Sequence, residues 1–354
     1  MVHIYAVIPK GEKVVFDVAG IDSSHDEVYS VPHGDISAVV SASPPVDYCR
    51  LRRDEAIHYL VAHQRVVEEV MRFFPVLPVK FGTTLPGTTG VYHFLAQGEE
   101  LLRNAMDKFA GLIQMEVVAL WKLSEVLKEI AREKSIVQLK AKVLAQGSES
   151  SMDDRIAIGR MVQESLERRR FILREKLITP LRKAARDLVV NPIMNDDMVA
   201  NLAFLVDKVG QDILEQHLEA LDKEFEGRLH LRCVGPLPPY SFASVEVKSP
   251  SFDAINEACR NLGLGEKATL DEIKQAYRQL AGQWHPDHNP DKPEAESRMA
   301  ELTRSYDLLT LYAANLTPNN GNTQCRFDRK TVKKALLIAI RRYDTAMDEG
   351  PSYS

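Results

Sequence analysis

The feature that most constrains this chain is a pair of amphipathic segments near its C-terminus, separated by a polar stretch that contains His-Pro-Asp. The segments 270–283 and 294–311 each repeat apolar side chains at the three- and four-residue spacing of a helix face. Proline cannot continue a helix, so Pro286 must end the first segment. The pattern predicts two antiparallel helices joined by an exposed loop. The apolar positions are Ile273, Ala276, Tyr277 and Leu280 in the first helix and Met299, Leu302, Tyr306 and Leu309 in the second.

The start of the first helix is also predictable. Thr269 is a suitable N-cap, and Asp271 and Glu272 follow in the first turn, where the helix dipole favours carboxylates. The loop itself admits a catalytic alternative, with His285 as a general acid–base beside Asp287. No nucleophile or oxyanion hole is identifiable near them, so a binding surface is favoured over an active site.

The rest of the chain alternates between strand and helix periodicity. This order predicts an α+β architecture with helices on one face of a sheet. The long helix carries an Arg168-Arg169-Arg170 cluster, expected on a solvated face. The proline-rich run 235–242 predicts a boundary or a rigid turn, and 248–252 a linker. Strands are predicted over 3–8, 34–42, 76–81, 112–121, 198–206 and 228–234, and helices over 52–73, 92–109, 150–188 and 211–225.

Composition bounds the function. The length of 354 residues suits two or three domains, and a net charge of −5 with a pI near 6.1 argues against a nucleic-acid partner. No apolar stretch reaches the roughly 18 residues of a membrane helix, so stable membrane insertion is not expected. The opening MVHIYAVIPKGEK is typical of a strand rather than a signal peptide. The dispersed Cys49, Cys233, Cys259 and Cys325 indicate thiols in a reducing cytosol. We therefore expect a cytoplasmic protein.

No motif for an enzyme or a cofactor is present. The sequence lacks a P-loop, GxGxxG, GxSxG and HExxH. His58 and His63 are five residues apart on a predicted helix, a step that does not bring two imidazoles onto one metal. We expect no catalytic residue, no cofactor and no metal site.

The N-terminal two-thirds resembles a known family. The segments IYAVI, GDISAVVS, AIHYLVAHQRVVEEV with VLPVKFGTTL, MEVVALW and GPLPPYSFASV are similar to those of the GvpL/GvpF gas vesicle proteins, over about residues 1–247. The resemblance implies an α+β domain at 1–110 and a ferredoxin-like α+β domain at 111–247. It also implies a non-enzymatic accessory protein that engages GvpA, the hydrophobic shell subunit, mainly through the first domain.

An apolar surface would suit such a partner, because a subunit that polymerises through apolar contacts needs them covered until assembly. Val76, Leu77, Pro78 and Phe81, together with the strand 36–40, are candidates for this surface. The alternative is that these residues fill the core of the domain.

The C-terminal third resembles the J-domain of Hsp40 co-chaperones over residues 254–316, after a linker at 248–253. The resemblance is carried by AYRQLA, the LGL turn before it, and AESRMAELTRSYDLL after the His-Pro-Asp loop. It implies an all-α helical hairpin that docks on a DnaK-type Hsp70 and stimulates ATP hydrolysis. It also implies that the Hsp70-binding residues are His285, Pro286, Asp287, Lys274, Arg278 and Tyr277.

The chain departs from the J-domain pattern in three places. Gln279 and Gln283 stand where the family often has lysine, which predicts a weaker attraction to an acidic partner. The segment 255–259 replaces the usual aromatic and acidic start, and the arginine-rich fourth helix is not evident in 310–315.

The region 317–354 is predicted to be a linker followed by a basic amphipathic helix over 328–347. Such a helix can lie on a membrane surface or bind an acidic groove, but more often it packs on its own domain, and it can also replace the missing fourth helix.

Together these features favour a gas vesicle assembly factor that binds GvpA or other vesicle proteins and recruits Hsp70. The alternatives are a minor structural component of the vesicle, a general Hsp70 co-chaperone and an enzyme of an unfamiliar kind.

Overall fold

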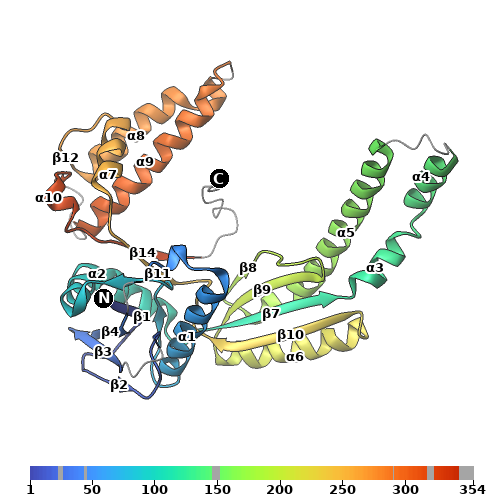
Figure 1. The fold of residues 1–354 in the computed structure, drawn as a ribbon, viewed down its shortest axis with the longest axis horizontal. Coiled ribbons are helices and arrows are strands. Elements are labelled where there is room, and N and C mark those ends of the chain that lie inside the picture. The colour runs from blue at the N-terminus through green and yellow to red at the C-terminus, as the bar shows by residue number, and fades with distance from the viewer. Residues whose placement is uncertain (23–26, 44–45, 146–151, 290, 317–322, 343–354) are drawn as a thin grey trace. The chain divides into compact units, whose positions relative to one another are not determined.

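The computed structural model describes residues 1–342 except 23–26, 44–45, 146–151, 290 and 317–322 (Figure 1). The chain forms two compact units. The first unit combines Met1–Ala110 with Ala243–Arg341, and the second combines Gly111–Phe242 with the chain from Arg342 on. The mixed helix-and-sheet architecture expected from the sequence is confirmed.

The first unit is built on an antiparallel sheet with the order β2-β3-β4-β1-β5, in which β6 also pairs with β1. Every residue of the central strand β1 is buried, because helices cover both faces of the sheet. Phe94 and Leu95 of α2 share one core with Ile4, whereas His63 of α1 lies against Tyr5. The elements are β1 (Val2–Ile8), β2 (Val15–Phe16), β3 (Val28–His33), β4 (Ile36–Ala42), a 3-10 turn η1 (Tyr48–Arg50), α1 (Arg53–Met71), β5 (Leu77–Pro78), β6 (Thr84–Leu85) and α2 (Gly87–Phe109).

Of the two alternatives for the apolar residues around Val76 and in strand 36–40, a partner surface or the core, the structure places all but Phe81 in the core. Val76, Leu77 and Pro78 are buried, Phe81 is half-buried, and strand 36–40 is buried throughout. Their burial follows from their place, since β4 and β5 both pair with the central strand β1.

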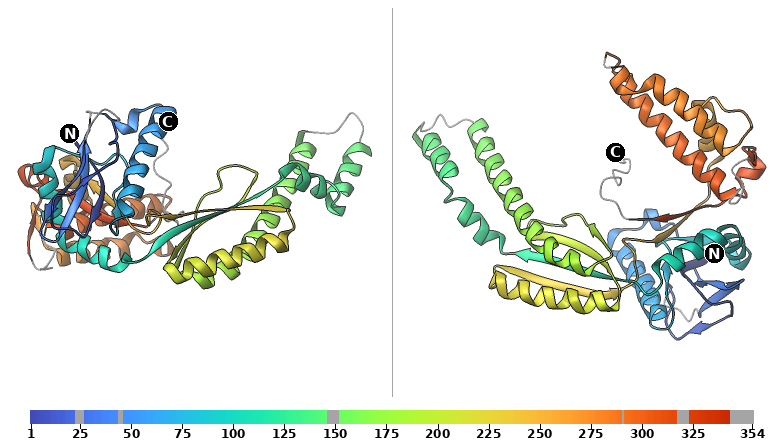
Figure 2. Two further views of the ribbon diagram at one scale, coloured as in Figure 1. Left: turned by 90° about the horizontal axis from the view of Figure 1, so that it is seen from below. Right: turned by 180° about the vertical axis from the view of Figure 1, so that it is seen from behind.

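The second unit holds an antiparallel sheet with the order β10-β7-β9-β8. Its helices cross between β7 and β8 and between β9 and β10, which is the element order that the ferredoxin-like expectation calls for. Figure 2 shows α6 running along β10. The elements are β7 (Ile113–Trp121), α3 (Leu123–Ile130), α4 (Lys134–Ala145), α5 (Met152–Leu181), a 3-10 turn η3 (Arg182–Ala184), β8 (Asp187–Val190), β9 (Met198–Val206), α6 (Lys208–Phe225) and β10 (Leu229–Leu237).

The arginine cluster on α5 is only partly solvated, contrary to the prediction. Arg168 is exposed, but Arg169 contacts Glu129 and Glu133. Arg170 is 5% exposed and donates to the carbonyl oxygens of Met198 at 3.0 Å and Asp196 at 3.2 Å. Arg170 therefore connects α5 by hydrogen bonds to the start of β9 and the residues just before it.

A helical subdomain completes the first unit. Its core joins apolar side chains from α7, α8 and α9 with those of the chain that follows them. The elements are β11 (Ser244–Lys248), α7 (Phe252–Asn261), β12 (Lys267–Ala268), α8 (Leu270–Trp284), a 3-10 turn η4 (Pro286–His288), α9 (Glu294–Leu316), β13 (Cys325–Arg326), α10 (Arg329–Val332) and β14 (Leu337–Arg341).

The predicted amphipathic helix over 328–347 is wrong for the described residues up to 342. Helix α10 has only four residues, and the chain then extends into β14, which pairs with β11. Consecutive residues Ala335–Ile338 are all buried. Extended chain between two apolar surfaces can bury consecutive side chains, as at Leu337 and Ile338 here, whereas a surface helix buries one stripe. Residues 343–347 of the predicted helix lie outside the described residues.

The predicted domain boundaries also differ from the structure. Strand β11 was assigned to the second domain, which was predicted to end at 247, but Val245 lies in the core of the first unit. Because β11 ends at Lys248 and α7 starts at Phe252, the connection is 249–251 rather than 248–253. Within the described residues, no helix is both long enough and apolar enough to cross a membrane.

Candidate partner-binding site at the His-Pro-Asp loop

Helix α8, which leads into the loop, has a well-defined start. Thr269 Oγ1 accepts a hydrogen bond from the Glu272 backbone N–H at 3.2 Å, and the Glu272 carboxylate accepts one from the Thr269 N–H at 2.7 Å. This reciprocal capping box satisfies two of the backbone donors that a helix start leaves without partners. The predicted N-cap is confirmed.

The helix ends at the His-Pro-Asp sequence for the expected reason. His285 adopts an extended backbone conformation, and Pro286 opens the 3-10 turn η4. His285 Nδ1 accepts from the Asp287 N–H at 3.2 Å, so the imidazole folds over its own loop. Asn289 Nδ2 donates to the carbonyls of Gln283 at 2.8 Å and His285 at 3.2 Å. These short-range bonds hold the loop in one shape.

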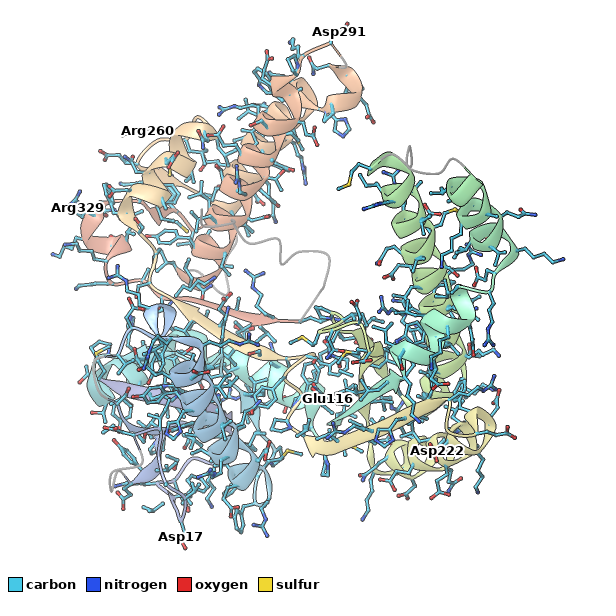
Figure 3. All side chains as sticks on the ribbon, turned by 45° about the vertical axis from the view of Figure 1, so that its right-hand side comes forward. Asp17, Glu116, Asp222, Arg260, Asp291 and Arg329 are labelled. Atoms are coloured by element: carbon cyan, nitrogen blue, oxygen red, sulfur yellow. The ribbon has the colours of Figure 1, made fainter. Side chains whose placement is uncertain are left out.

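The side chains of His285 and Asp287 both face solvent. The side chain of His285 is 47% exposed and that of Asp287 is 85% exposed, with His285 Nδ1 3.7 Å from Asp287 Oδ2. In Figure 3, Asp291 marks this end of the hairpin and Arg329 lies near the opposite end. These groups therefore lie on an exposed, internally hydrogen-bonded loop at the tip of the hairpin.

A basic row continues from the loop along α8. Lys274 and Arg278 are one helical turn apart, and His285 follows Arg278 by seven residues, so all three lie on one side of the helix. Arg278 is exposed and Lys274 half-buried, and neither is ion-paired with an acidic side chain of the described residues. This leaves both cations available to an acidic surface.

Tyr277 lies elsewhere. Its ring stacks on Tyr306 of α9 with centroids 4.3 Å apart, and its hydroxyl lies 3.2 Å from Thr303 Oγ1. Tyr277 thus joins the two helices of the hairpin and borders the basic row rather than belonging to it.

The described residues contain no group of three or more His, Cys, Asp and Glu side chains suited to a metal ion. The second unit has a groove of about 460 Å³ over Trp121, Leu173 and Phe225. At its rim, Arg169 is already engaged by Glu129 and Glu133.

A buried pair of histidines, His3 and His63, was not predicted from the sequence. The sequence indicates His63 only as one of two helix histidines that cannot share a metal, but its Nδ1 lies 2.9 Å from Nε2 of His3, and both rings are buried. Burial lowers the pKa of His63 to about 4 and that of His3 well below its usual value, and the nearby His63 lowers the pKa of His3 further. The two histidines are sixty positions apart in the sequence, so no local pattern predicts their contact.

Comparison with known proteins separates the chain into two parts. The family described as gas vesicle synthesis protein GvpL/GvpF matches residues 1–244, and the DnaJ domain matches residues 250–313. Gas vesicle protein F of Nostoc sp. (strain PCC 7120) is 26% identical over 246 residues, which are 69% of this chain and 98% of that protein.

Two further matches agree with this division. The crystal structure of gas vesicle protein GvpF from Anabaena sp. PCC7120 matches with a TM-score of 0.56 at 26% identity, over 68% of this chain and 96% of that one. The chaperone protein DnaJ of Nitratidesulfovibrio vulgaris (strain DP4) is 44% identical over 68 residues, 19% of this chain and 16% of that protein. This chain therefore belongs to the GvpL/GvpF family of gas vesicle proteins and carries a DnaJ domain after the family region.

Proposed function

We propose that this protein is a non-enzymatic gas vesicle assembly factor. It binds GvpA, the hydrophobic shell subunit, or other vesicle proteins, and it recruits a DnaK-type Hsp70 through its J-domain. It acts in the cytoplasm, in association with vesicles. Neither of its two families is a family of enzymes, and Hsp70 supplies the ATP hydrolysis, so the chain needs no cofactor.

The observation that carries the Hsp70 half is the His285-Pro286-Asp287 loop. The loop is exposed, is braced by Asn289, and continues into the basic side of α8. We propose that these three residues, with Lys274 and Arg278, contact Hsp70, and that Tyr277 contributes at the border. Charged residues on an exposed surface mainly speed and orient association with a partner of opposite charge.

The vesicle half rests on family membership and on exposed apolar side chains. Helix α1 buries its later turns, but Ile57, Leu60 and Val61 in its first half are 48%, 37% and 47% exposed. They recur at three- and four-residue spacing and so form one stripe. We propose this α1 stripe as the contact for an apolar vesicle protein, because Val76, Leu77 and Pro78 are buried in the core.

The proposal is tested by the steady-state ATPase rate of a bacterial DnaK. The parent protein should stimulate hydrolysis, whereas His285→Gln should not, because it removes a proposed contact with Hsp70. The fold should be retained, since the imidazole is exposed and hydrogen-bonds only within its own loop. His230→Gln serves as the control, since His230 is exposed on β10 in the second unit. Equal and negligible rates for parent and variant would remove the Hsp70 half for that DnaK.

A further inference from the structure

Strand β14 comes after the J-domain in sequence but is shared between two hydrophobic cores. Leu336 and Ile338 belong to the core of the sheet formed by β1–β5, and Ile340 packs against that core. Leu337, between them, belongs to the core of α7–α9. Side chains of a strand alternate between its faces, so Ile338 and Ile340 of β14 face one core and Leu337 faces the other.

Side chains from both sides also hold the backbone around β14. Gln97 of α2 donates to the Leu336 carbonyl at 2.5 Å and accepts from the Leu336 N–H at 3.3 Å. Asn315 of α9 does the same at Ile338, donating at 3.1 Å and accepting at 2.9 Å. Each amide side chain thereby pairs with the backbone as a neighbouring strand would. Gln97 comes from the sheet domain, which we define as β1–β6 with α1 and α2, and Asn315 comes from the J-domain.

The partner strand adds charged contacts. Glu246 of β11 is 8% exposed and lies opposite Ala339 of β14. Its carboxylate oxygens lie 2.9 Å from Nζ of Lys80, 2.9 Å from Nζ of Lys248 and 3.3 Å from Nε of Arg341. Burial alone would raise the pKa of Glu246, but hydrogen bonds from Lys248 and Lys80 lower it to about 2. Because Lys80 comes from the sheet domain and Arg341 from β14, this group ties the two together.

The fit against α2 is close. A Cβ on Gly98 would lie 3.0 Å from Ile338 Cδ1 and 3.2 Å from Leu102 Cδ1. The glycine thus leaves room for the Ile338 side chain on α2, and any larger residue there would push against it.

We propose that β14 is a coupling strand, which turns the J-domain from a tethered module into an insertion held rigidly on the sheet domain between β11 and β14. The positioning residues are Gln97, Asn315, Glu246 and Ile338. The functional consequence, which rests on the proposed function, is that an Hsp70 at the His-Pro-Asp loop occupies a fixed place relative to the α1 stripe. A flexible linker would raise only the local concentration of Hsp70.

The experiment measures the distance between the two domains in the full chain by pulsed electron paramagnetic resonance. Spin labels are attached at Asp17→Cys, after β2, and at Glu296→Cys on α9, both at exposed positions. Cys49 and Cys233 are replaced by serine. Cys259 and Cys325 are buried, and burial raises the pKa of the Cys259 thiol to about 11, which keeps it unreactive.

A coupling strand predicts a narrow distance distribution in the parent. Gln97→Ala combined with Asn315→Ala should make it about twofold wider, since tethered modules sample many separations. Glu100→Ala, at an exposed position of α2, should leave it narrow. Ile338→Ser provides the same comparison if the double variant does not fold. If the distance distributions of the parent and the uncoupled variant are equally wide, or equally narrow, the proposal is overturned.

The DnaK ATPase rate separates this result from the proposed function. An uncoupled variant should stimulate hydrolysis as well as the parent does, because it retains the whole loop and α8. If neither stimulates DnaK, the proposed function fails, yet the distance distributions still decide whether β14 couples the domains.

Discussion

At the scale of single residues, the buried His3–His63 pair makes the stability of the first unit depend on pH. The folded chain keeps His63 neutral down to about pH 4, whereas in the unfolded chain its pKa is near 6.5. Between these values the unfolded state binds a proton that the folded state does not. The free energy of unfolding is therefore complete above about pH 6.5 and falls as the pH drops towards 4.

We expect His63 alone to contribute about 3 kcal/mol to this loss, and His3 to add to it in the same direction. Urea unfolding followed from neutral to acidic pH measures the slope. The double variant His3→Gln/His63→Gln should flatten it, while His58→Gln, at an exposed position of the same helix, should keep it. A slope unchanged in the double variant would assign the acid sensitivity to other groups.

Residues with local partners were predictable from the sequence, and residues with distant partners were not. Thr269 caps a helix through Glu272, three residues on, and the pattern revealed it. Arg170 reads as one more cation in an arginine run, yet it is buried against the carbonyl of Met198, twenty-eight residues away. Hydrogen bonds made across the fold leave no spacing to detect.

At the scale of elements, the capping box of α8 provides a test of what orders the hairpin. Thr269→Ala removes the acceptor for the Glu272 N–H, and losing an N-cap costs about 1 kcal/mol. Amide hydrogen exchange in the first turn of α8 should accelerate, and Thr269→Ser should restore protection. Unchanged exchange in Thr269→Ala would mean that packing against α9, and not the cap, holds this turn.

An element with one buried face can be predicted from the periodicity of its apolar residues. Helix α8 shows a single apolar stripe, and the predicted range 270–283 agrees with Leu270–Trp284. Strand β14 was mistaken for part of a helix, because apolar residues at successive positions match more than one periodicity. The strand depends on two cores that lie on opposite sides of it, and neither is visible in the local sequence.

At the scale of the whole molecule, the family regions and the His-Pro-Asp loop between its two helices could be predicted, but the connection between the regions could not. The sequence suggests domains in succession, with the J-domain last. In the structure, the chain leaves the first unit after α2, returns to it as β11, and closes it with β14 beyond the J-domain. This return depends on pairing between Ser244–Lys248 and Leu337–Arg341, segments separated by the whole J-domain.

The proposed role of the α1 stripe in binding an apolar vesicle protein can be tested by substitution. Replacing Ile57, Leu60 and Val61 together by serine should reduce co-purification of GvpA by at least about tenfold, since three apolar contacts of this kind contribute more than the roughly 1.4 kcal/mol that corresponds to that factor. The free energy of unfolding should fall by less than for fully buried side chains, because these three are between 37% and 48% exposed.

The matched control is Val15→Ser, since Val15 is 53% exposed on β2 and lies outside the stripe. It should capture GvpA as the parent does, and both variants should still stimulate DnaK, because neither touches α8 or its loop. Full capture by the triple serine variant would show that another surface binds the shell subunit. Loss of ATPase stimulation together with capture would instead indicate that the substitutions had unfolded the first unit, which urea unfolding of the same sample would detect.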